Sequence, residues 1–397
     1  MNNESRPGPL TGVRVLDLTS MISGPVATMM LADQGADVIK VEPLSGDLVR
    51  GAGPNRSGIT SMFVSSNRSK RSLALDLKKD EFLWTSSISF VASANCALYC
   101  GANVDFVDID PNTGLMSISA LEKKLQIALS ENKLPKIIIP VHLSGSSCDM
   151  ESIFNLSKKY GFKIIEDASH AIGGKYKNNF VGSCKYSDIS IFSFHPVKII
   201  TTGEGGMALT NNEELADKMR ILRGHGITSE KFEFESPGPW YYEQKLLGYN
   251  YRITDIQTAL GISQLKKLNK FVSKRNSLAR FYRNKLEGNN FFKLLDVPKD
   301  VYSSYHLAIV KILNSNSVFH KKLFEWMRAN EVWVQLHYWP IHLQPFYRRL
   351  GFKRGYLPNS EDYAESCFSI PLHFETTEKD QIKVLKLLEE GLEKITF

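Results

Sequence analysis

The distribution of aromatic residues divides this chain into two segments. Of the 42 Phe, Trp and Tyr residues, only Phe63 precedes residue 81, and all nine His and all five Cys also lie beyond that point. Aromatic side chains supply much of the buried area of a protein core. Because one core would not normally sort them so unevenly, we predict two separate units with a boundary near residues 79–83.

The first segment has the pattern of a β-α-β unit. An apolar strand is expected at 12–18, a helix at about 24–35 and a second strand at 36–43, where Pro43 ends it. A basic stretch at 67–78 runs into a short strand. No Gly-x-Gly-x-x-Gly sequence follows the first strand, so nothing here indicates a dinucleotide site.

Beyond residue 80, apolar runs typical of strands alternate with helical patterns. This alternation predicts an α/β fold with a mainly parallel sheet, helices on both of its faces and ligand chemistry beyond the carboxyl ends of the strands. A smaller α+β domain is expected to follow, giving domains 1–80, 81–270 and 271–397. The predicted strands are 103–109, 137–143, 162–167, 188–194, 206–210, 305–313 and 332–337, and the predicted helices are 91–101, 149–160, 253–286 and 377–395.

Composition narrows the class of protein and partner. No apolar stretch reaches the roughly 18–20 residues that span a bilayer, and the polar start lacks a signal-peptide core, so we expect a cytoplasmic protein. The net charge of +7 suits an anionic small molecule at least as well as a nucleic acid, and we expect neither nucleic acid nor membrane as a partner. Cys96 and Cys100 have helical spacing and are interpreted as small core residues, with no metal site.

Three strand ends carry the residues with chemical potential. Lys198 lies in the turn SFHPVKIITTGEGG, whose Ser, Thr and Gly residues suit a phosphate cup, although an isolated lysine is usually a surface residue. Asp167 closes the apolar strand FKII and requires a cationic partner or strong hydrogen-bond donors, unless it caps a helix. His170 and Phe90 lie within reach of the same position, but read alone they would be a structural histidine and a core aromatic.

Several motifs after residue 80 resemble the DegT/DnrJ-type sugar aminotransferases, which are pyridoxal-phosphate enzymes of the aspartate aminotransferase fold (fold type I). The matching strings include SISFVASAN, FVDIDPNTG, PVHLSG, EDASHAIGG, SFHPVKIITTGEGG, LRGHGI, LGYNYRITDIQTALGISQLKKL and HYWPIHLQPFY. Their number and order make the resemblance specific for 81–397. SSISFVASAN, ISQLKKL and VQLHYWPI are most similar to the transaminases that make the 4-amino precursor of pseudaminic acid.

The resemblance implies roles for four residues around the cofactor. Lys198 matches the lysine that binds pyridoxal 5′-phosphate covalently and moves the proton during transamination. Asp167 matches the carboxylate that faces the pyridine nitrogen and keeps it protonated. His170 matches the residue beside the ring oxygen, and Phe90 matches the aromatic side chain that stacks on the ring.

Further positions match the phosphate and substrate sites of the family. Ser193 matches a phosphate-binding hydroxyl, and Asn250 matches a residue that reaches the phosphate of the neighbouring subunit, which implies a homodimer. His337 and Tyr338 match a region near the nucleotide sugar. Asn250 could instead be a turn residue, and the other pair could be strand packing.

The implied reaction is transfer of an amino group, with glutamate as donor, to a UDP-linked 4-keto-6-deoxy sugar in surface polysaccharide or nonulosonic (pseudaminic) acid biosynthesis. The family carries an earlier segment whose Ser-Gly-Thr turn binds the cofactor phosphate through backbone N–H groups, and this chain has no such tripeptide. Losing two or three hydrogen bonds to a charged group costs roughly 3–9 kcal/mol of binding.

Residues 9–79 instead resemble the start of class III (CaiB/BaiF-type) CoA-transferases. The matching strings are PLTGVRVLDLT, SGPVATMMLADQGADVIKVEPLSGD and NRSKRSLALDLK. In that family these parts shape the CoA pocket, so Arg50 and residues 68–71 would face phosphates, but the catalytic aspartate lies in a region that is missing here. Two alternatives to an active aminotransferase therefore remain, an inactive chimera that keeps the family fold and a CoA-transferase.

Overall fold

The computed structural model describes residues 9–10, 14–17, 23–34, 37–43, 55–56, 59–60, 70–75 and 81–395. The chain forms two compact units, Met1–Lys79 and Asp80–Phe397. Arg50, for which the sequence predicts a phosphate contact, lies outside the described residues, as do the side chains of 68–71.

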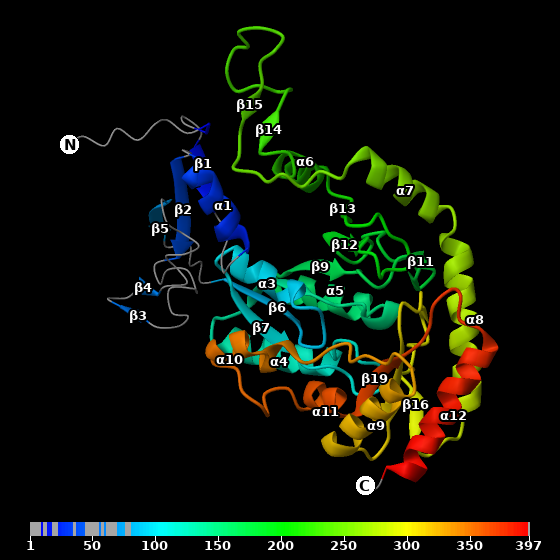
Figure 1. Ribbon diagram of the computed structural model, residues 1–397. Helices are drawn as coiled ribbons and strands as arrows, with labels where there is room; N and C mark the ends of the chain where they lie inside the picture. The colour runs from blue at the N-terminus through cyan, green and yellow to red at the C-terminus, as the bar shows by residue number, and fades with distance from the viewer. Residues whose placement is uncertain are drawn as a thin grey trace. The chain divides into compact units, whose positions relative to one another are not determined.

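The first unit contains the β-α-β arrangement that the sequence predicts. Its parallel sheet has the order β1-β2-β5, and helix α1 contacts β1 and β2 (Figure 1). A two-stranded hairpin, β3 with β4, completes the described elements. The bounds are β1 Arg14–Asp17, α1 Ser23–Asp33, β2 Asp37–Pro43, β3 Asn55–Arg56, β4 Ile59–Thr60 and β5 Lys70–Leu75.

The second unit is built on a six-stranded sheet with the order β13-β12-β9-β8-β6-β7. Every neighbouring pair is parallel except β12 and β13, which are antiparallel, so the predicted mainly parallel α/β sheet is confirmed. The strands are β6 Phe82–Ser86, β7 Asn103–Val107, β8 Pro135–Ile139, β9 Lys163–Asp167, β12 Ile189–Ser193 and β13 Gly206–Leu209. Strand β6 was not predicted, because so short an apolar run does not reveal its conformation by periodicity.

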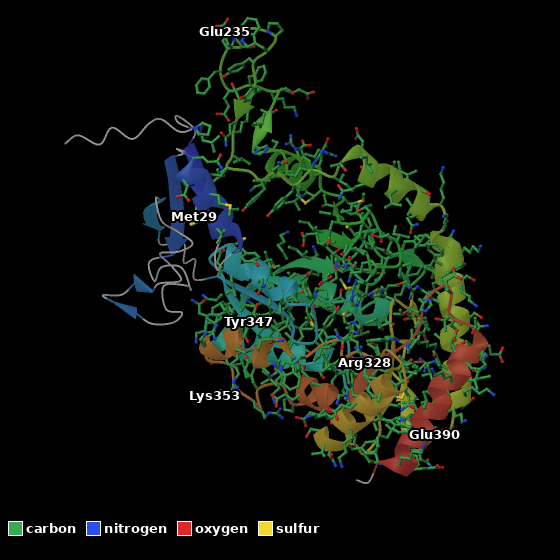
Figure 2. All side chains as sticks on the ribbon, in the orientation of Figure 1. Met29, Glu235, Arg328, Tyr347, Lys353 and Glu390 are labelled. Atoms are coloured by element: carbon green, nitrogen blue, oxygen red, sulfur yellow. The ribbon has the colours of Figure 1, made fainter. Side chains whose placement is uncertain are left out.

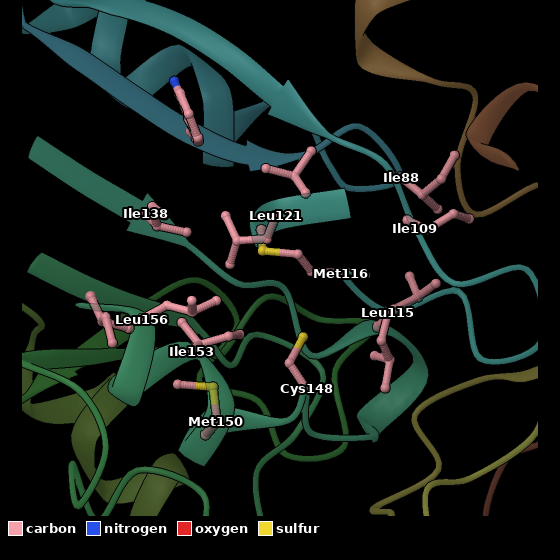
Figure 3. Packing of buried hydrophobic residues seen from close by; sticks show 14 of the residues in the cluster. Ile88, Ile109, Leu115, Met116, Leu121, Ile138, Cys148, Met150, Ile153 and Leu156 are labelled. Carbon is pink, nitrogen blue, oxygen red and sulfur yellow. The ribbon is translucent and has the colours of Figure 1, made fainter. Parts of the chain in front are cut away.

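Alternating side chains of this sheet enter two different cores. Trp84, Val107 and Ile138 pack with helices α4 (Ile118–Ser130) and α5 (Met150–Tyr160) on one face (Figure 3). Leu83, Phe106 and Ile139 pack with α3 (Ala92–Tyr99) on the other face. Successive residues of a strand point to opposite faces, which explains how each short strand contributes to both cores. Helices therefore cover both faces, as predicted.

The C-terminal part forms its own core around the antiparallel sheet β16-β18-β19. Figure 2 labels Arg328 and Glu390 on two of its helices, α9 and α12, and Tyr347 on α10, which reaches the large sheet. The elements of this part are α8 Leu268–Leu286, β16 Phe292–Leu294, β17 Val301–Tyr302, β18 Ala308–Ile312, α9 Ser317–Ala329, α10 Pro345–Arg349, α11 Pro358–Ser366, β19 Cys367–Ile370 and α12 Glu378–Lys394.

The remaining elements lie within or between the two parts. They are β10 Lys175–Tyr176, β11 Asn179–Phe180, α6 Glu213–Leu222, β14 Ile227–Thr228, β15 Glu243–Gln244 and α7 Asp255–Leu265, with 3-10 turns at Leu143–Gly145 and Ile341–Leu343. The segment between β14 and β15 stands away from the large sheet in Figure 1, and Figure 2 marks Glu235 within it. In the described part of the chain, no helix is long and apolar enough to cross a membrane.

Three sequence predictions are wrong in detail. The helix expected at 253–286 is two helices, α7 and α8, separated by a turn at Lys266 and Lys267. α8 buries several side chains whereas α7 buries none, so the two pack differently. Residues 332–337 are not a strand, because only Gln335 forms a bridge, to Ser369. Cys100 is exposed rather than in the core, since it lies beyond the last turn of α3.

Gly145 tests how tightly the loop after β8 is packed against the loop that precedes β18. Its φ is +102°, and a Cβ atom there would lie 2.7 Å from the backbone nitrogen of Tyr305. We expect Gly145→Ala to lower the free energy of unfolding by about 2–5 kcal/mol, combining left-handed strain with overpacking. Gly161→Ala, at φ +81° with nothing within 4 Å, should cost only about 1–2 kcal/mol. Urea unfolding of both variants measures this, and equal losses would contradict it.

Candidate functional site

The site lies where two neighbouring parallel strands end. Asp167 is the last residue of β9, and its backbone pairs with Ile191 of β12. After β12, the chain turns through Lys198, whose N–H donates to the carbonyl of His195 at 3.0 Å. Because carboxyl ends of parallel strands meet at one edge of a sheet, the carboxylate and the lysine come to the same place. Burial lowers the pKa of Lys198, while the nearby Asp167 acts in the opposite direction.

His170 is buried beside these two residues. Its Nε2 lies 3.1 Å from the hydroxyl of Tyr338, and its ring centre lies 4.4 Å from that of His306. Burial, with smaller contributions from His306 and Lys198, holds the pKa of His170 well below its usual value. Its Nδ1 is buried and has no hydrogen-bond partner among the described residues. The structure thus leaves one polar atom of this ring available to a ligand.

Aromatic side chains from both parts of this unit lie near Lys198, Asp167 and His170. The ring of Phe90 is 62% exposed, and its centre lies 6.4 Å from that of Tyr338. Burial raises the pKa of the Tyr338 hydroxyl, which therefore stays protonated at neutral pH. Next to it, His337 Nδ1 lies 2.8 Å from Ser369 Oγ, and burial lowers the pKa of His337 to about 4.

The carboxylate of Asp167 is held at both oxygens. Its Oδ1 accepts a hydrogen bond from the backbone N–H of Ser169 at 3.1 Å, and its Oδ2 accepts one from Ser93 Oγ at 2.5 Å. The carboxylate therefore has a fixed orientation. This also excludes the alternative that Asp167 caps a helix, because neither donor is a helix N–H group that follows it.

Two predicted residues lie apart from this contact network. Ser193 ends β12, and its hydroxyl accepts from the N–H of His195 at 3.4 Å. Asn250 forms a bridge with Gly224, and its Oδ1 accepts from Arg252 Nε at 2.8 Å. Among the described residues, no hydrogen bond or ring contact joins Asn250 to the group around Lys198.

Ser93 and His306 are residues of the site that the sequence did not indicate. Ser93 lies within the SISFVASAN motif, where its spacing of four residues from Ser89 was the available signal. His306 had no such signal, since it reaches His170 only through tertiary packing. Within the described residues there is no cluster of three or more His, Cys, Asp or Glu that could hold a metal ion.

Comparison with known proteins places this geometry in a family. The model of the DegT/DnrJ/EryC1/StrS aminotransferase family matches residues 71–389. The chain belongs to this family. Its members are pyridoxal-phosphate-dependent aminotransferases of fold type I, as predicted from the motifs. The model of CoA-transferase family III matches residues 10–82, which the first-segment motifs also predicted.

Individual relatives narrow the comparison. A Campylobacter jejuni UDP-4-amino-4,6-dideoxy-N-acetyl-beta-L-altrosamine transaminase is 39% identical over 317 residues, which are 80% of this chain and 81% of that protein. The structure of Helicobacter pylori PseC, an aminotransferase of pseudaminic acid biosynthesis, is 33% identical, with a TM-score of 0.72 over 80% of this chain and 81% of PseC. A Streptococcus pneumoniae relative in its PMP form is 26% identical, with a TM-score of 0.72 over 81% and 84% of the two chains.

The buried imidazoles predict a pH dependence of stability. Burial holds the pKa of His306 well below its usual value, as for His170. The unfolded chain binds a proton below its ordinary pKa while the folded chain does not, so acid removes stability. Between about pH 7.5 and about pH 5.5 the free energy of unfolding of the wild type should fall. In His306→Gln this fall should be smaller by about 1.4 kcal/mol, because that histidine no longer contributes to it.

Urea unfolding at each pH measures this difference. A surface replacement, His373→Gln, is the control and should keep the wild-type slope. An unchanged slope in His306→Gln would show that its ring is accessible to protons in the folded protein.

Proposed function

We propose that this chain is an aminotransferase that transfers an amino group from glutamate to a UDP-linked 4-keto-6-deoxy sugar, within surface polysaccharide or pseudaminic acid biosynthesis. The observation that carries this is the meeting of Lys198 with Asp167 at adjacent strand ends, beside a buried His170 with an unpartnered nitrogen. The C. jejuni and H. pylori relatives support the substrate class.

The side chains fit the ring of pyridoxal phosphate. Lys198 has a pKa lowered by burial, which makes its amine available for the covalent bond. Asp167 offers a fixed anion for a protonated pyridine nitrogen. If Tyr338 donates to Nε2 of His170, then Nδ1 carries the proton and can donate to an oxygen on the ring. Phe90 supplies an exposed aromatic face for stacking.

Pyridoxal phosphate, when bound, supplies an electron sink for the negative charge that develops at the donor carbon. The protein supplies the remaining functions. Lys198 would hold the cofactor covalently, and its free amine would move a proton between the donor carbon and the cofactor. Asp167 keeps the pyridine nitrogen protonated, and His170 orients the ring. His337 and Tyr338 border the space for the sugar.

The chain offers few donors for the phosphate of the cofactor. Ser193 offers one hydroxyl, and the chain contains no Ser-Gly-Thr tripeptide to supply the backbone donors of the family. We therefore expect cofactor binding weaker than in relatives that carry this tripeptide, by up to the roughly 3–9 kcal/mol of the missing hydrogen bonds. An inactive protein that retains the family fold is the second candidate, and the same deficit favours it.

We further propose a homodimer in which Asn250 reaches the partner's phosphate site. Exposed apolar residues are frequent in the sequence from residue 240 to the end of α7, a helix that buries none of its own residues. Monomers rarely leave such a face open to water. The exposed residues are Trp240, Tyr242, Leu246, Leu247, Tyr249, Tyr251, Ile253, Ile256, Leu260, Ile262 and Leu265.

Each predicted domain is assigned one role in this function. We propose that 81–270 binds the cofactor, that 271–397 closes over the substrate through His337 and Tyr338, and that 1–80 plays no part in amino transfer. The last assignment rests on the lack of the CoA-transferase catalytic region. Purified protein that transferred CoA from a thioester to a free carboxylic acid would overturn it.

Lys198 provides the direct test of the proposed chemistry. Excess pyridoxal phosphate should give the wild type a visible absorbance band from the lysine–cofactor bond, and Lys198→Ala should lack it. Glutamate should discharge the band in the wild type. Lys185→Ala removes an exposed lysine and should behave as the wild type. A wild type without the band at saturating cofactor would contradict the function.

The dimer is tested by a charge on α7. Ile256, which is 85% exposed, should become buried between subunits, so Ile256→Glu should yield monomers in sedimentation experiments. The matched control is Ile382→Glu, an exposed isoleucine on α12, which should leave the dimer intact. Monomeric wild type at all accessible concentrations would refute the dimer.

A further inference from the structure

Ser93 and Ser89 form a short chain of hydrogen bonds that ends on Asp167. Ser93 Oγ lies 2.5 Å from Asp167 Oδ2, and Ser89 Oγ lies 2.8 Å from Ser93 Oγ. Both hydroxyls are buried, with residue exposures of 6% and 3%. Ser89 precedes α3 and Ser93 lies in its first turn, so their four-residue separation brings the two hydroxyls together.

The direction of this chain follows from counting protons. An ionised carboxylate can only accept hydrogen bonds, and a serine hydroxyl has a single proton to donate. Ser93 gives that proton to Asp167, so Ser89 must be the donor in the bond between the two serines. Successive bonds with the same direction polarise one another and strengthen the last bond.

Ser93 is the second residue of α3, and its hydroxyl bonds Asp167 rather than a group of its own helix. It lies in the first turn of α3, where Val91 at the N-cap provides no side-chain hydrogen bond. Serine hydroxyls satisfy the free N–H groups of a helix chiefly from the N-cap position, which Val91 occupies here. Here the hydroxyl instead bonds a carboxylate on another element, which indicates that the bond serves the site.

The bond complements the one from Ser169. The N–H of Ser169 fixes Oδ1, and Ser93 fixes Oδ2, so the carboxylate cannot rotate about its bond to Cβ without breaking one of them. An acceptor lone pair is thereby kept in one direction. The segment that carries Ser93 also carries Phe90, so one short piece of chain orients both the anion and the stacking ring.

We propose that the Ser89–Ser93 pair positions Asp167 toward the pyridine nitrogen of the cofactor, with Ser93 as the positioning residue and Ser89 as its support. This rests on the proposed function, since it assigns a purpose to groups around the same site. Without Ser93, the carboxylate loses one buried donor and its fixed orientation, and the protonated pyridine ring loses a well-placed partner.

The test measures cofactor binding and the protonation of the pyridine nitrogen. Ser93→Ala should raise the Kd for pyridoxal phosphate by up to about 150-fold, because the misaligned carboxylate then loses part or all of its own hydrogen bond to the charged pyridine nitrogen. The NMR signal of isotopically labelled pyridine nitrogen should shift toward its unprotonated position. Ser89→Ala should produce the same changes to a smaller extent, and Ser93→Thr, which keeps the hydroxyl, should restore most of the binding.

Ser86→Ala is the matched control. Ser86 is 1% exposed in the neighbouring strand β6, and its hydroxyl has no hydrogen-bond partner among the described residues. Its removal should change neither the Kd nor the nitrogen signal. If Ser93→Ala does not fold, as judged by circular dichroism, Ser89→Ala decides the question. It removes only the support of the Ser93 hydroxyl, so a raised Kd with a shifted nitrogen signal supports the positioning role and wild-type values overturn it.

The outcomes separate this inference from the proposed function. Wild-type protein with no visible band in excess cofactor would overturn both. A wild type with the band, together with Ser93→Ala and Ser89→Ala variants that match Ser86→Ala, would overturn the positioning role alone. Equal losses in all three alanine variants would also overturn it, since they would reflect a general disturbance of packing.

Discussion

The parallel pairing of β9 with β12 is the constraint on which the site depends. It brings the carboxyl ends of the two strands to one edge, and so places Asp167 beside the turn that carries Lys198. Asp167 is partly buried, and a carboxylate withdrawn from water without partners is destabilised. The hydrogen bonds from Ser93 and Ser169 offset this destabilisation, and they also fix the orientation of the Asp167 carboxylate.

The C-terminal part completes the site from the other side. Ser304 Oγ donates to the carbonyl of His170 at 2.9 Å, and Tyr338 contacts the ring of the same histidine. Gly145 permits the close approach of the loop that leads to His306, because any side chain there would meet backbone atoms. Small shifts between the two parts would therefore change the position of His170.

Much of this could be predicted from local sequence because the signals were local. Strand FKII followed by Asp167, and the Gly- and Thr-rich turn around Lys198, contain their chemistry within a few residues. The breaks in the pattern had tertiary causes. Residues 332–337 resemble a strand but lack a continuous partner, and the run at 253–286 divides where the buried face of α8 begins.

The sequence alone indicated that two units resembling different families are joined, that an α/β sheet carries a lysine and an aspartate at its strand ends, and that the chain resembles the sugar aminotransferases. Composition and motif order can be read directly from the sequence. Only the tertiary structure decided that Ser93 holds Asp167 and that His306 packs on His170. These contacts join residues 74 and 136 positions apart, and hydrogen bonds and ring packing between distant segments leave no periodic trace in a single sequence.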